Sequence, residues 1–102
     1  MTSFVTRKRL EIFIEAHALE RLEVELASAG FKGWSVFRGV EGAGTHGSWR
    51  QTGVGESEAY MVIAIGSEYA TEQALAWLTR YFSEFPGIVA ASDVSVMRGD
   101  RF

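Results

Sequence analysis

The sequence predicts an α+β fold of the ferredoxin-like type, with the element order β-α-β-β-α-β, a four-stranded antiparallel sheet and a long loop between the second and third strands. Three observations lead to this prediction. Apolar residues alternate or run continuously in four short segments, and they recur at helical spacing in two longer ones. Each helical segment follows a strand-like one. A stretch with six glycines in twenty residues, GVEGAGTHGSWRQTGVGESE at 39–58, separates the two middle strands.

In the first half of the chain, the spacing of apolar residues changes from that of a strand to that of a helix, and a second strand follows. Residues 8–14 alternate as a half-buried strand does, and residues 15–28 carry apolar side chains every three or four positions. Gly30 follows, where a left-handed residue commonly ends a helix. Residues 31–40 are rich in aromatic and β-forming side chains and predict the second strand. The apolar positions behind these periods are Leu10, Ile12 and Ile14 in the strand, and Leu19, Leu22 and Leu26 in the helix.

The second half repeats the order strand, helix, strand. Residues 59–66, AYMVIAIG, form a nearly continuous apolar run, which is typical of a central strand buried on both faces. A second helix is predicted over residues 69–83, and Pro86 prevents it from continuing. Residues 88–97 predict the last strand. The apolar stripe of this second helix is expected at Ala74, Leu75, Leu78 and Phe82.

Composition predicts one domain over residues 1–102 and argues against several classes of protein. The net charge of −3 is the wrong sign for general binding to a nucleic-acid backbone. No apolar run approaches the ~20 residues that span a bilayer, and the N-terminus does not have the pattern of a signal peptide. The absence of cysteine removes disulfides and thiolate metal sites. We therefore expect a cytoplasmic protein without membrane insertion.

The aromatic content predicts an oligomer. Seven Phe, three Trp and three Tyr carry more apolar area than one small core is expected to hide. If both helices cover one face of the sheet, the other face must be covered by something else. Phe13, Val36 and the apolar residues of 59–66 are expected to make that second face apolar. A partner subunit is the simplest cover.

The segment AGFKGWSVFRGVEGAG, residues 29–44, resembles the PII signal-transduction family. In that family the first helix ends in glycine, and a Gly-x-Gly stands at the base of a long mobile loop. The element order and the arginines near the end of the chain agree with it too. The resemblance implies a homotrimer that binds adenine nucleotides in the clefts between subunits and signals through its loop. The matching residues are Gly30, Phe31, Gly33, Ser35, Val36, Gly42 and Gly44.

Departures from the usual PII pattern indicate a divergent branch. Thr45 and His46 stand where typical members have Arg and the Gln that helps to hold magnesium and 2-oxoglutarate. Residues 45–58 contain no tyrosine, and the segment EFPGIVAASD, 84–93, contains no Lys or Arg for ATP phosphates. The sequence is more similar to PII-like proteins linked to bicarbonate uptake and carboxysomes. That branch implies AMP or ADP in preference to ATP, bicarbonate as a candidate second ligand, and a location in the cytoplasm beside or within carboxysomes.

The candidate nucleotide-binding residues fall in three places. The Gly-x-Gly of the loop base offers backbone N–H groups for an anion, although such a glycine pair is also typical of a plain flexible turn. Arginines after the last strand can hold phosphate in a bidentate fork, although terminal arginines are commonly solvated. From the resemblance, these arginines reach the nucleotide of the neighbouring subunit. The predicted set is Gly42, Gly44, Thr45, His46, Gly87, Arg98 and Arg101.

Trp49 and Arg50 lie near the predicted tip of the loop, and an exposed aromatic beside an arginine is typical of a binding hot spot. The alternative is that Trp49 folds back onto its own domain. The loop is expected to contact a membrane transporter or a carbon-fixation protein. No prosthetic group and no metal site are predicted, because the two histidines lie far apart without a supporting carboxylate pattern.

Two other functions remain open from the sequence. One is a small dimeric ferredoxin-like enzyme that uses His46 or His17 as a general base, which requires a lined pocket and an orienting partner for the imidazole. The other is a trimeric protein similar to the divalent-metal-tolerance proteins of the same architecture. The favoured prediction needs no catalysis, because glycines and arginines suited to phosphate occur without a nucleophile and base pair.

Overall fold

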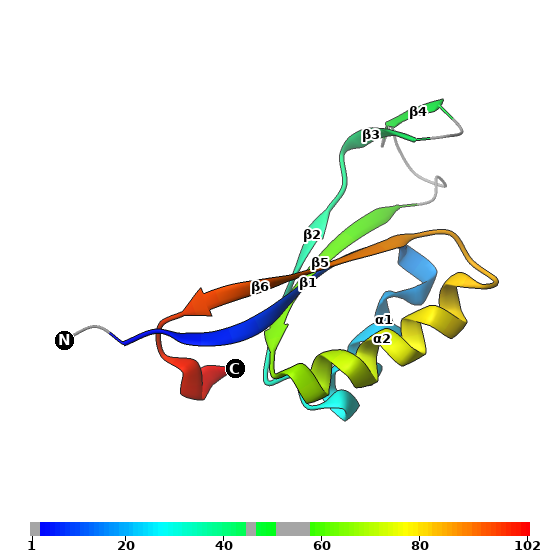
Figure 1. Cartoon of the computed structure of the whole chain (residues 1–102). Helices are drawn as coiled ribbons and strands as arrows, with labels where there is room; N and C mark the ends of the chain where they lie inside the picture. Colours follow the sequence, from blue (N-terminus) through cyan, green and yellow to red (C-terminus); the bar gives the residue numbers. More distant parts are fainter. Residues whose placement is uncertain (1–2, 45–46, 51–57) are drawn as a thin grey trace.

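The computed structural model describes residues 3–44, 47–50 and 58–102, and for 47–50 it describes the backbone (Figure 1). Two helices and six strands are present in this part of the chain, followed by a short 3-10 helix near the C-terminus. In chain order they are β1 (Val5–Glu15), α1 (Ala16–Ala29), β2 (Trp34–Arg38), β3 (Glu41–Gly44), β4 (Gly47–Arg50), β5 (Ala59–Gly66), α2 (Glu68–Phe82), β6 (Ile88–Val96) and η1 (Gly99–Arg101).

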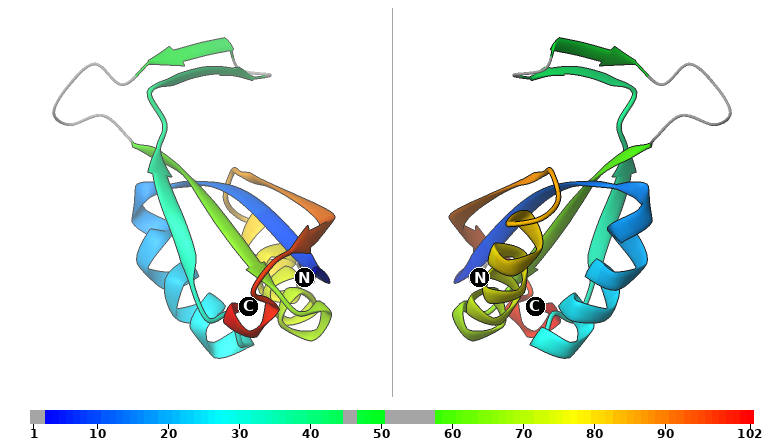
Figure 2. Two further views of the ribbon diagram at one scale, coloured as in Figure 1. Left: turned by 90° about the vertical axis from the view of Figure 1, so that its left-hand side faces the viewer. Right: turned by 90° about the vertical axis from the view of Figure 1, so that its right-hand side faces the viewer.

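Four of these strands form one antiparallel sheet in the order β2-β5-β1-β6. Both helices lie on the same face of this sheet, and no other long helix or strand of the described residues covers the opposite face (Figures 1 and 2). The predicted α+β ferredoxin-like fold is confirmed. β1 is a central strand, since it pairs with β5 on one side and with β6 on the other.

The core lies between the sheet and the two helices. Alternate residues of β1 point into it, and they meet residues that recur at helical spacing on α1 and α2. Full burial of each leucine or isoleucine stabilises the fold by roughly 1.5–3 kcal/mol. The largest fully buried side chains are Leu10, Ile12, Leu22, Leu26, Val62 and Leu78.

The helix ends follow the chemistry of their residues. Gly30 adopts the left-handed conformation, with φ of 113°, and its N–H donates to the carbonyl of Ala27 at 3.2 Å. Ser67 precedes α2, and its Oγ accepts a hydrogen bond from the N–H of Ala70 at 3.1 Å. α2 ends four residues before Pro86.

The second strand is shorter than its composition suggests. We predicted it over residues 31–40, whereas β2 spans Trp34–Arg38. Phe31 is buried in the core instead, and its ring lies so close to Gly66 that a Cβ there would be 2.7 Å from two ring carbons. An aromatic residue therefore fills the core before sheet pairing begins.

The glycine-rich segment is not one plain loop. β3 and β4 pair as an antiparallel hairpin, with Gly42 opposite Trp49 and Gly44 opposite Gly47. This two-stranded sheet stands away from the main sheet (Figures 1 and 2). Glycine weakens strand propensity, but its extended backbone still offers the hydrogen-bonding groups that a hairpin needs.

One predicted member of the open sheet face is wrong. Val36 lies opposite Val62, which is fully buried under the helices, so Val36 belongs to the helix-covered face and is partly exposed because β2 is an edge strand. Its neighbour Phe37 lies on the open face, as Phe13 does. The strand pairing joins one apolar row across this open face, made of Phe37, Met61, Phe13 and Ile88.

Replacing Leu22 with Ala should lower the free energy of unfolding by about 2–5 kcal/mol, because the change leaves a cavity in a fully closed core. Val24→Ala on the exposed side of the same helix is the matched control, since Val24 is 64% exposed. We expect a change of about 0.5 kcal/mol or less for the control. Denaturant unfolding of the two variants measures both values, and similar losses would contradict the assigned helix faces.

Candidate functional site

The C-terminal tail, residues 98–102, has a defined backbone. Arg98 adopts φ of 58° and ψ of 49°, and it is the only non-glycine residue with positive φ in the described part of the chain. The turn of η1 follows, in which the N–H of Arg101 donates to the carbonyl of Arg98 at 2.9 Å. Both arginine side chains are exposed. The tail therefore presents two guanidinium groups from a fixed turn.

Contacts from two other elements hold this tail. Arg7 of β1 donates through Nη2 to the carbonyl of Gly99 at 3.2 Å, and Lys32 donates to the carbonyl of Asp100 at 2.8 Å. Gly99 packs so closely on β1 that a Cβ would lie 2.1 Å from Cγ2 of Val5. A larger residue at that position would force the Val5 side chain to move.

The hairpin segment, residues 39–58, lies between β2 and β5, and contacts between these two strands hold its base. The N–H of Gly39 donates to the carbonyl of Ala59 at 2.7 Å. The Tyr60 hydroxyl donates to Oε2 of Glu58 at 2.5 Å, and Nη2 of Arg38 lies 3.7 Å from Oε1 of the same carboxylate. β2 and β5 are thus linked where residues 39–58 leave the sheet.

The Glu58 carboxylate raises the pKa of the Tyr60 phenol. Its hydrogen bond is the largest cause that raises the pKa of the Tyr60 phenol above the ordinary 10.0, and partial burial and the carboxylate charge raise it further. At the opposite end of the sheet, the ion pair with Asp93 raises the pKa of Lys8 in the same way. Both groups therefore keep their proton to a higher pH than an unpaired tyrosine or lysine does.

Gly87 is required by packing. Its φ of 144° is unfavourable for side chains, and a Cβ there would lie 2.4 Å from the Phe82 ring and 2.5 Å from the carbonyl oxygen of Phe13. Phe13 lies near the end of β1 from which α1 begins, so Gly87 lies at the same end of the sheet as the base of the hairpin segment.

The other predicted residues lie in the hairpin. Gly42 and Gly44 belong to β3, whose extended backbone does not gather successive N–H groups as an anion-binding nest does. Thr45 and His46 lie outside the described residues. Trp49 and Arg50 are the last two residues of β4, for which the backbone is described.

Arg98 and Arg101 lie far from the rest of the predicted set. The tail contacts Val5 and Arg7, whereas Gly87 contacts Phe13. The eight residue steps between Val5 and Phe13 span roughly 26 Å in a strand. Figure 1 shows the tail and the hairpin at opposite ends of the sheet. Within one chain, therefore, the structure does not bring the two halves of the predicted site together.

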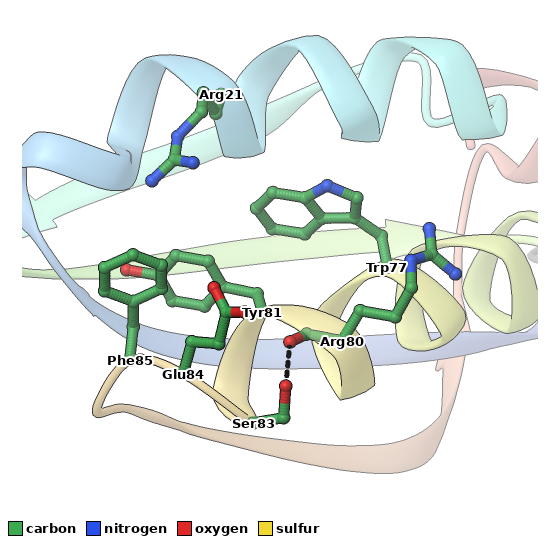
Figure 3. A pocket seen from close by; sticks show the side chains of 7 residues that line it. All are labelled: Arg21, Trp77, Arg80, Tyr81, Ser83, Glu84 and Phe85. Atoms are coloured by element: carbon green, nitrogen blue, oxygen red, sulfur yellow. Dashed lines mark hydrogen bonds between the residues drawn. The ribbon is translucent and has the colours of Figure 1, made fainter.

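A shallow hollow of about 420 Å³ lies between the helices, and sequence reasoning missed it (Figure 3). Its floor is a row of rings on α2 and the segment after it, in which Tyr81 stacks on Trp77 at 5.3 Å and on Phe85 at 4.8 Å. Arg21 of α1 covers the last two rings. The spacing of four residues along this row was a usable signal in the sequence. The lining also includes Arg80, Ser83 and Glu84.

His17 gives no support to a general base, and His46 lies outside the described residues. His17 is half exposed, lies 3.9 Å from Glu15, and is not among the residues that line the hollow. No cluster of three or more His, Cys, Asp or Glu residues suited to a metal occurs in ranges 3–44, 47–50 and 58–102. Among the helices described, none has the length and apolar character to cross a membrane.

The described fold is a ferredoxin-like antiparallel sheet with a long excursion between β2 and β5, an architecture that PII-like proteins share. The family model described as "Nitrogen regulatory protein P-II" matches residues 7–101. The chain belongs to this family, in agreement with the resemblance seen in its sequence. No curated protein sequence matches the chain.

Solved structures support a divergent PII-like branch. CPII, a nitrogen regulatory PII-like protein from Thiomonas intermedia K12 bound to ADP, AMP and bicarbonate, is 26% identical, with a TM-score of 0.88 over 100% of this chain and 98% of that one. CPII bound to ADP and bicarbonate has a TM-score of 0.87 at the same identity, over 100% and 99% of the two chains. GlnK from B. subtilis shares the fold at 16% identity, with a TM-score of 0.67 over 96% of this chain and 100% of that one.

The Tyr60 phenol should ionise above the ordinary pKa of 10.0, because its raised pKa reflects a hydrogen bond to a carboxylate. The stability that this bond adds is complete below the unfolded phenol pKa and is lost as pH rises through the folded one. Spectrophotometric titration of the wild type and Tyr60→Phe isolates this phenol by difference. In Glu58→Gln the pKa should fall toward the ordinary value. A phenol that ionises at or below the ordinary pKa in the wild type would contradict the link.

Proposed function

We propose that this chain is a non-catalytic regulatory protein that binds AMP or ADP in clefts between the subunits of a homotrimer. Bicarbonate is the proposed second ligand, and no prosthetic group is required. The segment 39–58 signals to a membrane transporter or a carbon-fixation protein, with Trp49 and Arg50 as its contact residues. The proposed location is the cytoplasm, beside or within carboxysomes.

The observation that carries this proposal is the separation of the predicted site residues along β1. Arg98 and Arg101 lie at one end of the sheet, and Gly87 and the base of the hairpin segment lie at the other. One chain cannot close them around one ligand. A neighbouring subunit that brings its tail to the hairpin end of this chain completes the site.

The open sheet face supplies a reason for subunits to associate. Phe13, Phe37 and Ile88 are 41%, 48% and 61% exposed, and the strand pairing joins them through Met61 into one row. Exposed apolar area of this kind is typical of an interface between subunits. Identical chains that associate through the same face can form a closed oligomer with rotational symmetry.

The choice of ligand follows from charge and from the relatives. CPII, a relative matched over its whole length, is described with ADP, AMP and bicarbonate. The tail arginines suit phosphate oxygens, and Thr45 and His46 with Gly42 and Gly44 are proposed on the opposite side of the ligand. The segment 84–93 has no cationic side chain, so a third phosphate would find little compensation. This favours AMP and ADP over ATP.

Arg98→Ala should weaken AMP or ADP binding at least tenfold, which corresponds to about 1.5 kcal/mol for a charge-assisted hydrogen bond. Calorimetry with AMP, ADP, ATP and bicarbonate measures the loss. Arg80→Ala removes the same charge from an exposed position on α2 and should leave the affinity within about twofold. Equal affinity in the wild type and Arg98→Ala would remove Arg98 from the site.

Phe13→Asp should dissociate the oligomer, because it introduces a charge into the middle of the apolar row. Analytical ultracentrifugation should give a trimer for the wild type and a single chain for the variant. Val24→Asp on the exposed side of α1 is the control and should stay trimeric. A wild-type monomer would overturn the proposed assembly. A dimer that binds no nucleotide would favour the enzyme alternative.

A further inference from the structure

We infer that Arg7 and Lys32 are positioning residues, which hold the tail so that Arg98 and Arg101 face the ligand of the neighbouring subunit. This inference rests on the proposed function and adds to it two cations from outside the tail. Neither residue belongs to the predicted nucleotide-binding set. Both act through the tail backbone, without touching the ligand.

The geometry shows two supports from separate elements. Arg7 reaches the carbonyl of Gly99 from β1, and Lys32 reaches the carbonyl of the next residue, Asp100, from the segment after α1. Arg7 also donates to the carbonyl of its neighbour Thr6 at 3.0 Å, which fixes the plane of the guanidinium. Two successive carbonyls of η1 are thus held from two directions.

The tail needs such supports to keep its shape. Arg98 lies in the left-handed region, which a non-glycine residue keeps only when its surroundings enforce it. Terminal residues are otherwise the part of a chain that orders least readily. A tail ordered before binding loses less conformational freedom when the ligand arrives, so affinity rises without a new ligand contact.

The two cations also keep their charge available. Arg7 and Lys32 donate to backbone carbonyls. None of the four cations Arg7, Lys32, Arg98 and Arg101 forms an ion pair within residues 3–44, 47–50 and 58–102. Asp100 is the single acidic residue of the tail. Four cations around one short turn, in a chain of net charge −3, form a locally positive corner suited to an anion.

The test separates positioning from general stability. Arg7→Gln and Lys32→Gln are compared with Lys8→Gln, which removes the same charge from the adjacent residue of β1 but leaves the tail contacts in place. Nucleotide affinity is measured by calorimetry with AMP and ADP. The same substitutions are then made in an Arg98→Ala, Arg101→Ala background, and their nucleotide affinities are measured. Hydrogen exchange of the Arg101 and Phe102 amides is followed without ligand in the wild type and in the variants that keep both tail arginines.

Each of Arg7→Gln and Lys32→Gln should weaken nucleotide binding about fivefold, and Lys8→Gln less than twofold. In the background without tail arginines, Arg7→Gln should have less than a twofold effect, because its influence passes through those arginines. Arg7→Lys, which keeps a cationic donor, should recover part of the loss. The amides of Arg101 and Phe102 should exchange faster in both Gln variants.

Two results would overturn the inference. Unchanged exchange of the tail amides in Arg7→Gln would show that Arg7 does not hold the tail. An equal loss of affinity with and without Arg98 and Arg101 would show that Arg7 acts by another route. If the wild type binds none of AMP, ADP and ATP, the proposed function fails, and the exchange rates alone then decide whether these cations order the tail.

Discussion

β1 pairs with β5 from Lys8 to Glu15 and with β6 from Val5 to Phe13, so a single strand fixes the register of three of the four strands of the sheet. Its even-numbered residues from Leu10 to Ile14 close the core, and its odd-numbered residues lie on the open face. The same strand holds the tail through Val5 and Arg7 near one end and contacts Gly87 through Phe13 near the other. Core, open face and site geometry therefore depend on one continuous ladder of hydrogen bonds.

The open face is divided by the same strand. Apolar residues form a row across the sheet at the level of Phe13, while Arg9 and Glu11 pair at 3.0 Å in the adjacent part of β1. In the proposed trimer, the apolar row supplies the area that leaves water, and the polar pair restricts which arrangements of subunits are acceptable, because buried charges must stay partnered. Association strength and orientation would then come from neighbouring parts of one surface.

The sequence was sufficient for the elements whose pattern is local. Alternation predicted β1, the leucine spacing predicted α1, and Gly30 predicted the end of that helix. The face of β2 was misjudged because an edge strand exposes both sides, which removes the contrast that distinguishes Val36 from Phe37. The β3 and β4 hairpin was missed because pairing between glycine-rich strands leaves no hydrophobic period to detect. Residue types suggested Arg98 and Arg101, but only the fold brings Arg7 next to Gly99, 92 positions away in the chain.

The placement of the tail and the hairpin at opposite ends of β1 has a consequence for how a ring of three chains would respond to its ligand. Each chain would contribute to two clefts, with its hairpin end in one and its tail in the next. Ligand that orders a tail in one cleft would act on a chain whose hairpin end belongs to another, so the three clefts would be linked in a closed circuit. The link would pass along β1, which is paired on both sides, so the state of one cleft would depend on how many of the three hold ligand.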